Sequence, residues 1–249
     1  MITESDMIKG AAEKADADEI LAFLMVGQSN MSGRGDLDAV EPIVNDRCTM
    51  FRMGTWQPMT EPICIDKSGM AEFAPGIGLA ASFADGLQKH TGKKIGLIPC
   101  AYGGSKLEKW LPGTALYDNA VFTAKLACRN ARLGGIIWHQ GESNCRNLNK
   151  DDYTEKFLFT MNSMRHELDA ENLPLILGEI SECMGERWSL DKWTAPFNLF
   201  LNELAEKLPV CAVASQKGLT LRCDGIHFDS PSCRELGRRY LKKYISLTE

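Results

Sequence analysis

Five short apolar runs, separated by longer amphipathic segments, are the feature of this sequence that most limits its fold. Each run is almost continuously apolar rather than alternating, which is typical of strands buried on both faces of a parallel sheet. The runs are Ile20–Val26, Lys94–Cys100, Gly135–His139, Leu173–Leu177 and Val210–Ala214. Strands that alternate with helices form an open parallel sheet between two helical layers. The sequence therefore predicts a three-layer α/β/α fold with a five-stranded, parallel, flavodoxin-like sheet.

The segments between the runs carry apolar residues at helical spacing. The expected helices cover residues 77–87, 116–131, 153–168, 197–208 and 230–244. The second should end at Gly134–Gly135, and the last should begin with Ser230 as N-cap and Pro231 as the first helical residue. Residues 35–75 show only weak periodicity, which suggests a long excursion over a functional site. We expect a single domain over residues 1–249, with 1–18 as a peripheral segment.

Charge and hydropathy exclude several classes of function. The 28 basic and 33 acidic side chains leave a net charge of −5. A nucleic-acid surface is not expected, because phosphate binding requires clustered Lys and Arg. No stretch approaches the ~18 consecutive apolar residues of a spanning helix, and the amino terminus lacks the features of a signal peptide. These observations predict a cytoplasmic protein that does not bind membranes.

The cysteines and histidines show no metal-binding pattern. Nine cysteines occur without a CxxC pair, and an odd number without a secretion signal favours free thiols over a disulfide framework. Four histidines are spread along the chain without ligand spacing. We therefore expect neither a metal ion nor a cofactor.

The residues after the first apolar run are of catalytic type. In parallel α/β sheets, ligands bind outside the carboxyl ends of the strands. The run leads through Gly27 and Gln28 into Ser29 and Asn30. A serine in such a turn exposes its hydroxyl above the sheet, where backbone N–H groups can hold an oxyanion. The Gly-x-Ser-x-Gly elbow is absent because Met31 occupies its last position. Taken alone, such a serine is more often a helix cap than a nucleophile.

Glycines and polar residues follow the second and third runs. Gly103 and Gly104 suit a turn, and they would also let a backbone N–H approach a substrate oxygen. His139, Gln140 and Glu142 follow the third run, where so many polar groups belong in a cleft or a turn. The Gln140 amide could donate to an oxyanion. A lone histidine such as His139 is more often structural than catalytic.

The last run is followed by Asp224 and, three residues later, His227. A carboxylate at this spacing can reach Nδ1 of the imidazole and leave Nε2 free to take a proton from a serine. An isolated Asp-x-x-His is weak and has an equally good structural interpretation. Its occurrence together with Ser29, the glycine pair and Gln140, all after strands of one sheet, favours a serine hydrolase.

Four stretches resemble the SGNH hydrolase superfamily, and within it the carbohydrate esterase family six branch and the related sialate O-acetylesterases. They are Phe23–Gly33, Ile98–Ser105, Trp138–Ser143 and Asp224–His227. The resemblance implies Ser29 as nucleophile and Asp224 with His227 as its triad partners. It implies an oxyanion hole of Ser29, Gly104 and Gln140. Contacts with substrate are expected from Gln28, Asn30 and Gly103. Glu142 would be a supporting residue or the alternative triad acid, because it also lies in one of the matching stretches. Gln140-Gly141-Glu142 stands where the wider superfamily usually carries Gly-x-Asn-Asp.

The activity implied by this resemblance is removal of O-acetyl groups from a small sugar or oligosaccharide of the acetylxylan or sialate type. The reaction would pass through an acyl-enzyme and need no cofactor. A lipase or thioesterase for longer acyl chains is one alternative, and a non-catalytic sugar-binding domain is another. The last is disfavoured because Ser29, Asp224 and His227 are all present. The sequence leaves the sugar and the oligomeric state open.

Overall fold

The structure, a computed structural model, describes residues 19–66, 74–146, 148–184 and 189–249. Its centre is a seven-stranded sheet in the order β3-β2-β4-β1-β5-β6-β7. All neighbouring strands are parallel except β3, which is antiparallel to β2. The strands are β1 (Ile20–Gly27), β2 (Cys48–Arg52), β3 (Thr55–Pro58), β4 (Lys94–Pro99), β5 (Arg132–His139), β6 (Leu175–Gly178) and β7 (Cys211–Ala214).

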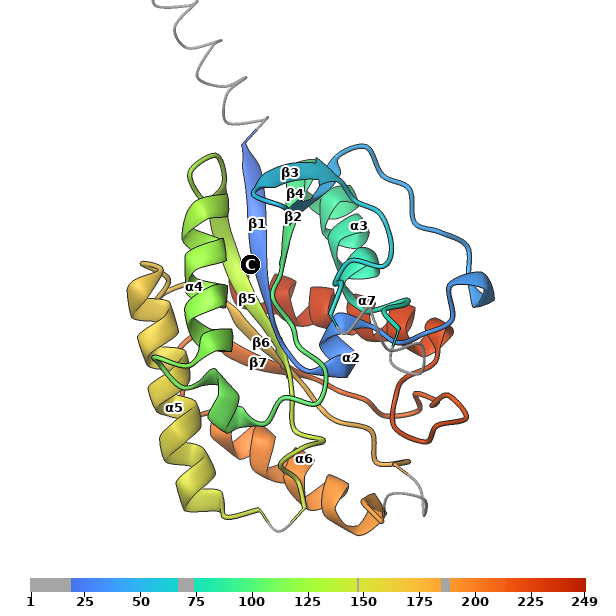
Figure 1. The fold of residues 1–249 in the computed structure, drawn as a ribbon, viewed down its shortest axis with the longest axis vertical. Helices are drawn as coiled ribbons and strands as arrows, with labels where there is room; N and C mark the ends of the chain where they lie inside the picture. Colours follow the sequence, from blue (N-terminus) through green and yellow to red (C-terminus); the bar gives the residue numbers. More distant parts are fainter. Residues whose placement is uncertain (1–18, 67–73, 147, 185–188) are drawn as a thin grey trace, which may run out of the picture.

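Helices cover both faces of this sheet (Figure 1). The α-helices are α2 (Ser29–Ser32), α3 (Ala80–Thr91), α4 (Ala115–Ala127), α5 (Lys150–Glu167), α6 (Asp191–Ala205) and α7 (Ser230–Thr248), and the 3₁₀ helices are η1 (Leu37–Ala39) and η3 (Leu107–Trp110). Side chains of α4, α5 and α6 pack in one apolar core, and those of α3 and α7 pack in a second. β1 contributes to both cores, with Leu24 in the first and Phe23 in the second. The predicted three-layer fold is confirmed.

All five predicted strands are present, as β1, β4, β5, β6 and β7. Their order, β4-β1-β5-β6-β7, is the flavodoxin-like order. After β1 the chain builds one side of the sheet and then returns to build the other side from β5. The carboxyl end of β1 therefore lies at the switch point, where such sheets bind ligands.

The predicted strand count was too low by two, because β2 and β3 lie in the weakly periodic segment. These strands form a hairpin at the edge of the sheet. Met53 and Gly54 between them both have positive φ, 53° and 79°, which is the requirement of a type I′ turn. The residues usually found in such a turn, Asn-Gly or Asp-Gly, are absent, and no residue of the edge strand β3 is fully buried. Local sequence therefore gave little indication of the hairpin.

Two predicted helix ends were also wrong. α7 is capped by Asp229, whose side chain accepts a hydrogen bond from Ser232 N at 2.9 Å, so Ser230 is its first residue. α4 ends at Ala127, and Gly134 and Gly135 lie inside β5. A Cβ on Gly135 would come within 2.8 Å of the carbonyl oxygen of Pro174. Close packing within the sheet, and not helix termination, explains these glycines.

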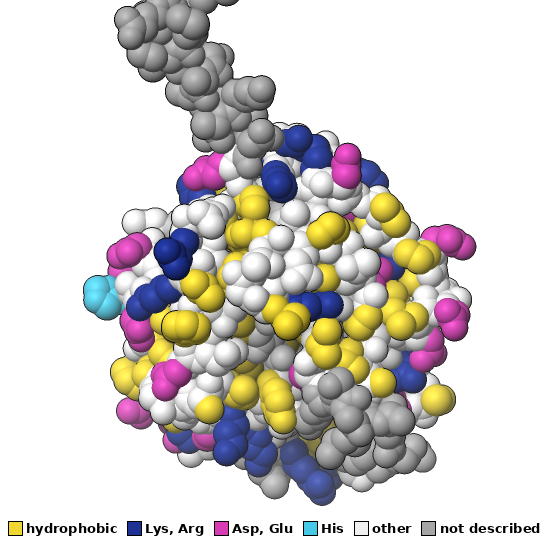
Figure 2. Space-filling model, turned by 45° about the horizontal axis from the view of Figure 1, so that its top comes forward, with side chains coloured by type: hydrophobic (Ala, Val, Ile, Leu, Met, Phe, Trp, Pro, Cys, Tyr) yellow, Lys and Arg dark blue, Asp and Glu magenta, His cyan; other side chains and the backbone are white. Residues whose placement is uncertain are grey.

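Three further expectations concern the cysteines, membrane-spanning helices and the distribution of surface charge. All nine cysteines are free, as predicted. Within the described parts of the chain, no helix is long and apolar enough to cross a membrane. On the face drawn in Figure 2, basic and acidic side chains lie close together at several places around the outline.

Candidate active site

The turn after β1 is set by close contact with β5. Gly27 has a φ of 132°, and a Cβ at this position would lie 2.2 Å from the carbonyl oxygen of His139. That same oxygen accepts a hydrogen bond from Gln28 N at 2.9 Å. A glycine is therefore required here, and the turn it forms starts α2 at Ser29. The Ser29 side chain is largely buried, since the residue is only 6% exposed.

Ser29, His227 and Asp224 form a continuous hydrogen-bonded chain. His227 Nε2 lies 2.9 Å from Ser29 Oγ, and His227 Nδ1 lies 2.9 Å from Asp224 Oδ2. An ionised carboxylate can only accept, so Nδ1 carries the proton and Nε2 of the neutral ring accepts from the serine hydroxyl. The structure therefore brings together the three residues that the sequence singled out, in the tautomer that a proton-accepting histidine requires.

Asp224 is held rigidly by the backbone of its own loop. Its Oδ1 accepts hydrogen bonds from Ile226 N at 2.8 Å and His227 N at 2.9 Å. Burial opposes the charge on this carboxyl, but these hydrogen bonds and the imidazole outweigh burial and lower the pKa of Asp224 below its ordinary value. The guanidinium of Arg222 lies 3.6 Å from Oδ2. The carboxylate thus stays charged and correctly oriented beside the imidazole.

Glu142 occupies a different position, behind the turn that carries Ser29. Its Oε1 accepts a hydrogen bond from Asn30 Nδ2 at 2.6 Å. Asn30 Oδ1 in turn accepts from Phe228 N at 3.1 Å, and its Nδ2 also donates to Ile226 O at 3.3 Å. Asn30 therefore joins the Ser29 turn to the loop of His227, and Glu142 holds Asn30 in place. Both side chains make their hydrogen bonds inside the protein.

His139 lies beside Glu142 at the end of β5. Tyr240 Oη donates to Trp138 O at 2.8 Å and has one proton, so His139 Nδ1, 3.0 Å away, must donate to it. His139 Nε2 then faces Glu142 Oε1 at 3.5 Å. Although burial opposes its charge, the contacts with His139 and Asn30 lower the pKa of Glu142. His139 is fully buried and does not contact Ser29, in keeping with a structural role.

The two glycines after β4 differ in the use of their N–H groups. Gly103 N donates to Asp66 Oδ2 at 2.6 Å, so it is already bonded within the protein. Gly104 has a φ of 71° and lies at the surface. Its N–H has no acceptor among the residues that the structure describes. Of the pair, Gly104 is the one whose N–H is open to a ligand.

Gln28 and Gln140 lock the loops after β1 and β5 together. Gln140 is fully buried, and its Nε2 donates to Asn144 Oδ1 at 2.6 Å and also lies 3.3 Å from both Ser105 O and Gln28 Oε1. Gln28 Oε1 also accepts from Ser143 N at 3.3 Å. Since the amide hydrogens of Gln140 have internal acceptors, its contacts assign it to holding these loops. The structure does not bring it to the open side of the site as an oxyanion donor.

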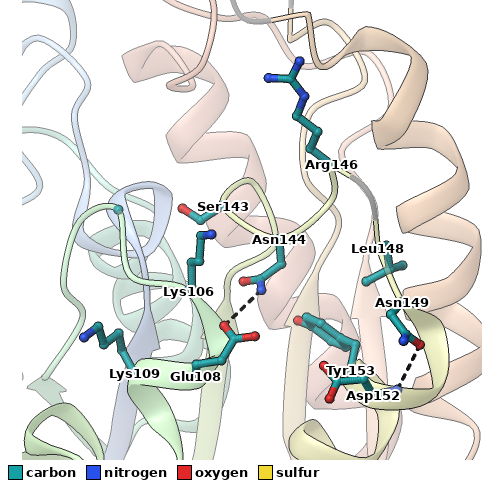
Figure 3. A pocket seen from close by; sticks show the side chains of 11 residues that line it. Lys106, Glu108, Lys109, Ser143, Asn144, Arg146, Leu148, Asn149, Asp152 and Tyr153 are labelled. Carbon is teal, nitrogen blue, oxygen red and sulfur yellow. Dashed lines mark hydrogen bonds between the residues drawn. The ribbon is translucent and has the colours of Figure 1, made fainter.

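A cavity of about 600 Å³ opens beside Gly104 and Ser143. Figure 3 shows its walls coming from the loop and 3₁₀ helix after β4, from the loop after β5 and from the first turn of α5. The lining side chains are Lys106, Glu108, Lys109, Ser143, Asn144, Arg146, Leu148, Asn149, Asp152 and Tyr153. Most of them are charged or polar. Such a lining offers many hydrogen-bond donors and acceptors.

The charges of this cavity do not cancel. Lys156 lies 3.4 Å from Glu108 and 2.6 Å from Asp152, and so partly neutralises both acids. Lys106, Lys109 and Arg146 have no carboxylate partner within the described parts of the chain. The cavity therefore presents an excess of positive charge beside Gly104.

Comparison with known families identifies the kind of protein to which this site belongs. A family model described as carbohydrate esterase, sialic acid-specific acetylesterase, matches residues 19–246. The chain belongs to this family. A probable carbohydrate esterase of Arabidopsis thaliana is 26% identical to this carbohydrate esterase over 246 residues, which cover 90% of each chain.

Solved structures show the same fold. The crystal structure of a protein from Arabidopsis thaliana has a TM-score of 0.79 at 24% identity and covers 92% of this chain and 98% of its own. The crystal structure of NanS has a TM-score of 0.73 at 16% identity, with 94% and 98% covered. A carbohydrate acetylesterase from Xanthomonas citri has a TM-score of 0.58 at 20% identity and covers 91% of this carbohydrate esterase and 56% of its own chain.

Several residues at the site were not found by sequence analysis. Arg34 and Asp66 form an ion pair beneath it, and Arg146 lines the cavity. Asp66 lies in the weakly periodic segment, where nothing local indicates that the fold brings it to Gly103. Lys106 was also missed, although its position just after the glycine pair at a strand end could have indicated a site residue. In the described ranges, no three His, Cys, Asp or Glu side chains gather where they could hold a metal ion.

Proposed function

We propose that this carbohydrate esterase removes O-acetyl groups from a sugar, with Ser29 as nucleophile and His227 as general base. The hydrogen-bonded chain from Asp224 through His227 to Ser29, 2.9 Å at each imidazole contact, is the observation that carries the proposal. A serine hydroxyl becomes a useful nucleophile when an adjacent, oriented base takes its proton. Asp224 orients the ring and stabilises the imidazolium as it forms.

The reaction proceeds in two steps. His227 Nε2 takes the proton of Ser29 as Oγ attacks the acetyl carbonyl carbon, and it returns that proton to the sugar oxygen as the ester C–O bond breaks. Acetyl-Ser29 remains. A water molecule, deprotonated by His227, then attacks the acetyl group, acetate leaves, and Ser29 regains its proton.

The tetrahedral intermediates need hydrogen-bond donors for their oxyanion. The N–H groups of Ser29 and Gly104 are proposed for this role, since Gly104 N has no acceptor among the described residues and Gly103 lies against Ser29. Loss of one oxyanion donor typically costs about 10²–10³-fold in kcat. Gln140 is not included, because its amide hydrogens already have internal acceptors.

The polar cavity beside Gly104 is the proposed site for the sugar. A lining of Lys, Arg, Asn, Asp and Glu side chains suits hydroxyl groups better than a long acyl chain, which favours a carbohydrate ester over a lipid ester. Its unpaired positive charge further favours a sugar that carries a carboxylate. The matching family is named for sialic acid, which is such a sugar.

Replacement of the nucleophile tests the reaction. We expect Ser29→Ala to lower kcat for p-nitrophenyl acetate by on the order of 10⁴–10⁶-fold. The far-ultraviolet circular dichroism spectrum should be unchanged. A fluorophosphonate should label the wild type, but not this variant. Ser143→Ala is a matched control from the same edge of the sheet and should still be labelled. More than about a tenth of wild-type activity in Ser29→Ala would rule out the nucleophile.

A substrate panel tests the proposed specificity. O-acetylated neutral sugars, O-acetylated sialic acid and octanoyl esters should be compared by kcat/KM. We expect acetyl esters to exceed octanoyl esters. Arg146→Gln and Lys106→Gln should raise KM for the carboxylate-bearing sugar and leave KM for p-nitrophenyl acetate within about twofold. Equal or faster hydrolysis of octanoate would move the enzyme to the lipase class.

A further inference from the structure

A buried ion pair lies directly beneath the proposed active site. Arg34 Nη2 is 2.7 Å from Asp66 Oδ2, and the two side chains are 1% and 4% exposed. Arg34 follows the turn of Ser29, whereas Asp66 belongs to the segment between β3 and α3. Charges this deeply buried are tolerated only where partners satisfy them. Their partners therefore indicate what the pair holds in place.

The carboxylate of Asp66 connects two loops of the site. Its Oδ2 accepts from Arg34 Nη2 and also from Gly103 N at 2.6 Å, while its Oδ1 accepts from Ser32 Oγ. Arg34 Nη1 donates to Ser32 Oγ at 2.9 Å and to Gly33 O at 2.8 Å. One side chain thus joins the Ser29 turn to the loop after β4. Hydrogen bonds to its charged form lower the pKa of Asp66, although burial opposes this.

The position of Gly103 depends on this pair. A Cβ on Gly103 would lie 2.6 Å from Arg34 Nη2, 2.9 Å from Asp66 Oδ2 and 3.6 Å from Ser29 Cβ. Gly103 is therefore enclosed between the ion pair and the serine. Its N–H points to Asp66, and the next residue, Gly104, turns through a φ of 71°. A shift of Asp66 would move the Gly104 N–H relative to Ser29.

We propose that Asp66 is a positioning residue for ester hydrolysis, which sets the distance between Ser29 and the Gly104 N–H through its bond to Gly103. The proposal rests on the function proposed above. Asp66 lies in the weakly periodic segment, and its carboxylate holds the loop after β4 that carries Gly104. This segment therefore has a role in the site. The effect should appear in kcat more than in KM, since an oxyanion donor acts on the transition state.

The main test is Asp66→Asn, with Glu61→Gln as matched control. Asp66→Asn keeps the shape of the side chain, removes its charge and weakens the acceptor of Gly103. Glu61 forms a second buried pair, with Arg234 of α7, at 2.6 Å and with side chains 5% and 8% exposed. Apart from this pair, Arg234 bonds to Glu41 O and Ser82 Oγ, away from the site. Both variants lose a buried ion pair, but only one pair touches the catalytic loops.

We expect urea unfolding to show reduced stability in both variants. At a temperature where both are folded, kcat for p-nitrophenyl acetate should fall by about 10–10³-fold in Asp66→Asn, with KM within about threefold. In Glu61→Gln, kcat should stay within about twofold. The rate of fluorophosphonate labelling at Ser29 should fall in parallel with kcat, because that reaction also places negative charge in the oxyanion hole. Equal kcat values in the two variants would overturn the proposal.

A second variant tests the proposal even if Asp66→Asn fails to fold. Ser32→Ala keeps both charges and removes only the hydroxyl that bridges Arg34 and Asp66. It should lower kcat by about 3–10-fold with KM unchanged, and wild-type kcat here would also overturn the proposal. An active Ser29→Ala variant contradicts the proposed function, whereas an inactive Ser29→Ala beside a fully active Asp66→Asn contradicts only the positioning role.

Discussion

At the scale of single residues, Asp224 and Glu142 show how two carboxyl groups near one site acquire different roles. From the sequence, either of them could be the triad acid. In the structure, Asp224 contacts His227 Nδ1 directly, whereas Glu142 contacts Asn30, which bonds to the backbone beside His227. The first can stabilise charge on the imidazole. The second can only hold the loops that carry Ser29 and His227.

Asp224→Asn should therefore be the more damaging change. An asparagine keeps the shape but cannot stabilise the imidazolium, and it allows the wrong tautomer of His227. We expect kcat to fall by on the order of 10⁴-fold with little change in KM. Steady-state kinetics on p-nitrophenyl acetate at pH 7 measure this. A loss of less than about tenfold would contradict Asp224 as the triad acid.

Glu142→Gln should have a smaller effect, because its influence passes through Asn30. The short hydrogen bond between Asn30 and Glu142 loses its charge, and the loop of His227 loses part of its support. We expect kcat to fall by about 3–30-fold, with a loss of about 1–3 kcal/mol in the free energy of unfolding. A defect in kcat larger than that of Asp224→Asn would reverse the two assignments.

At the scale of elements, what the sequence could predict follows from where each element gets its stability. β1 and β4 were found because continuous burial on both faces leaves a continuous apolar run. The hairpin of β2 and β3 was missed because it depends on pairing at the sheet edge. Gly134 and Gly135 were misread because a glycine needed for close packing looks the same in sequence as one that ends a helix.

The residues of the site also differ in how well the sequence predicts them. Ser29, Asp224 and His227 were predictable, because each follows a strand and Asp224 reaches His227 within one turn. Asp66 was not, since its partner Gly103 is 37 residues away and only the folded chain joins them. Gln140 was expected at the open side of the site by resemblance, yet its contacts lie inside. The contact between Ser29 and His227 spans 198 residues, but both follow apolar strands of one sheet and so could be placed together. Asp66 lies in a weakly periodic segment, so its contact with Gly103 is known only from the fold.

The turn after β1 provides a prediction at this scale. In Gly27→Ala, the new Cβ would lie 2.2 Å from the carbonyl oxygen of His139, at a φ that side chains rarely adopt. Strain and overpacking together should cost about 2–6 kcal/mol, and movement of α2 should abolish most activity. Gly92→Ala is the matched control, because Gly92 has a φ of 68° but nothing within 4 Å of the Cβ position. It should lose about 1–2 kcal/mol and retain activity within about twofold. Urea unfolding and kcat measure both; equal activity losses would contradict this account of the turn.

At the scale of the whole molecule, buried carboxylates link the loops that extend from different strands. Asp66 joins the turn after β1 to the loop after β4, and Glu142 joins the loop after β5 to the same turn through Asn30. Through Asn30 the connection continues to the loop that precedes α7. The arrangement of these loops therefore depends on ionised carboxyl groups.

This dependence predicts how stability responds to acid. The pKa values of Asp66 and Glu142 are lowered in the folded protein, because their hydrogen bonds, and the Arg34 guanidinium beside Asp66, outweigh burial. In the unfolded chain these groups titrate near their ordinary values, about 3.9 and 4.3. The unfolded state therefore binds protons first as the pH falls, so the stabilisation is complete above about pH 5 and is lost as the pH drops through the lower folded-state values. Free energies of unfolding in urea between pH 7 and pH 3 should fall steeply below pH 5 in the wild type. Asp66→Asn should start lower at pH 7 and fall less, so that the two curves converge in acid. Curves that remain parallel down to pH 3 would show that Asp66 does not contribute to this dependence.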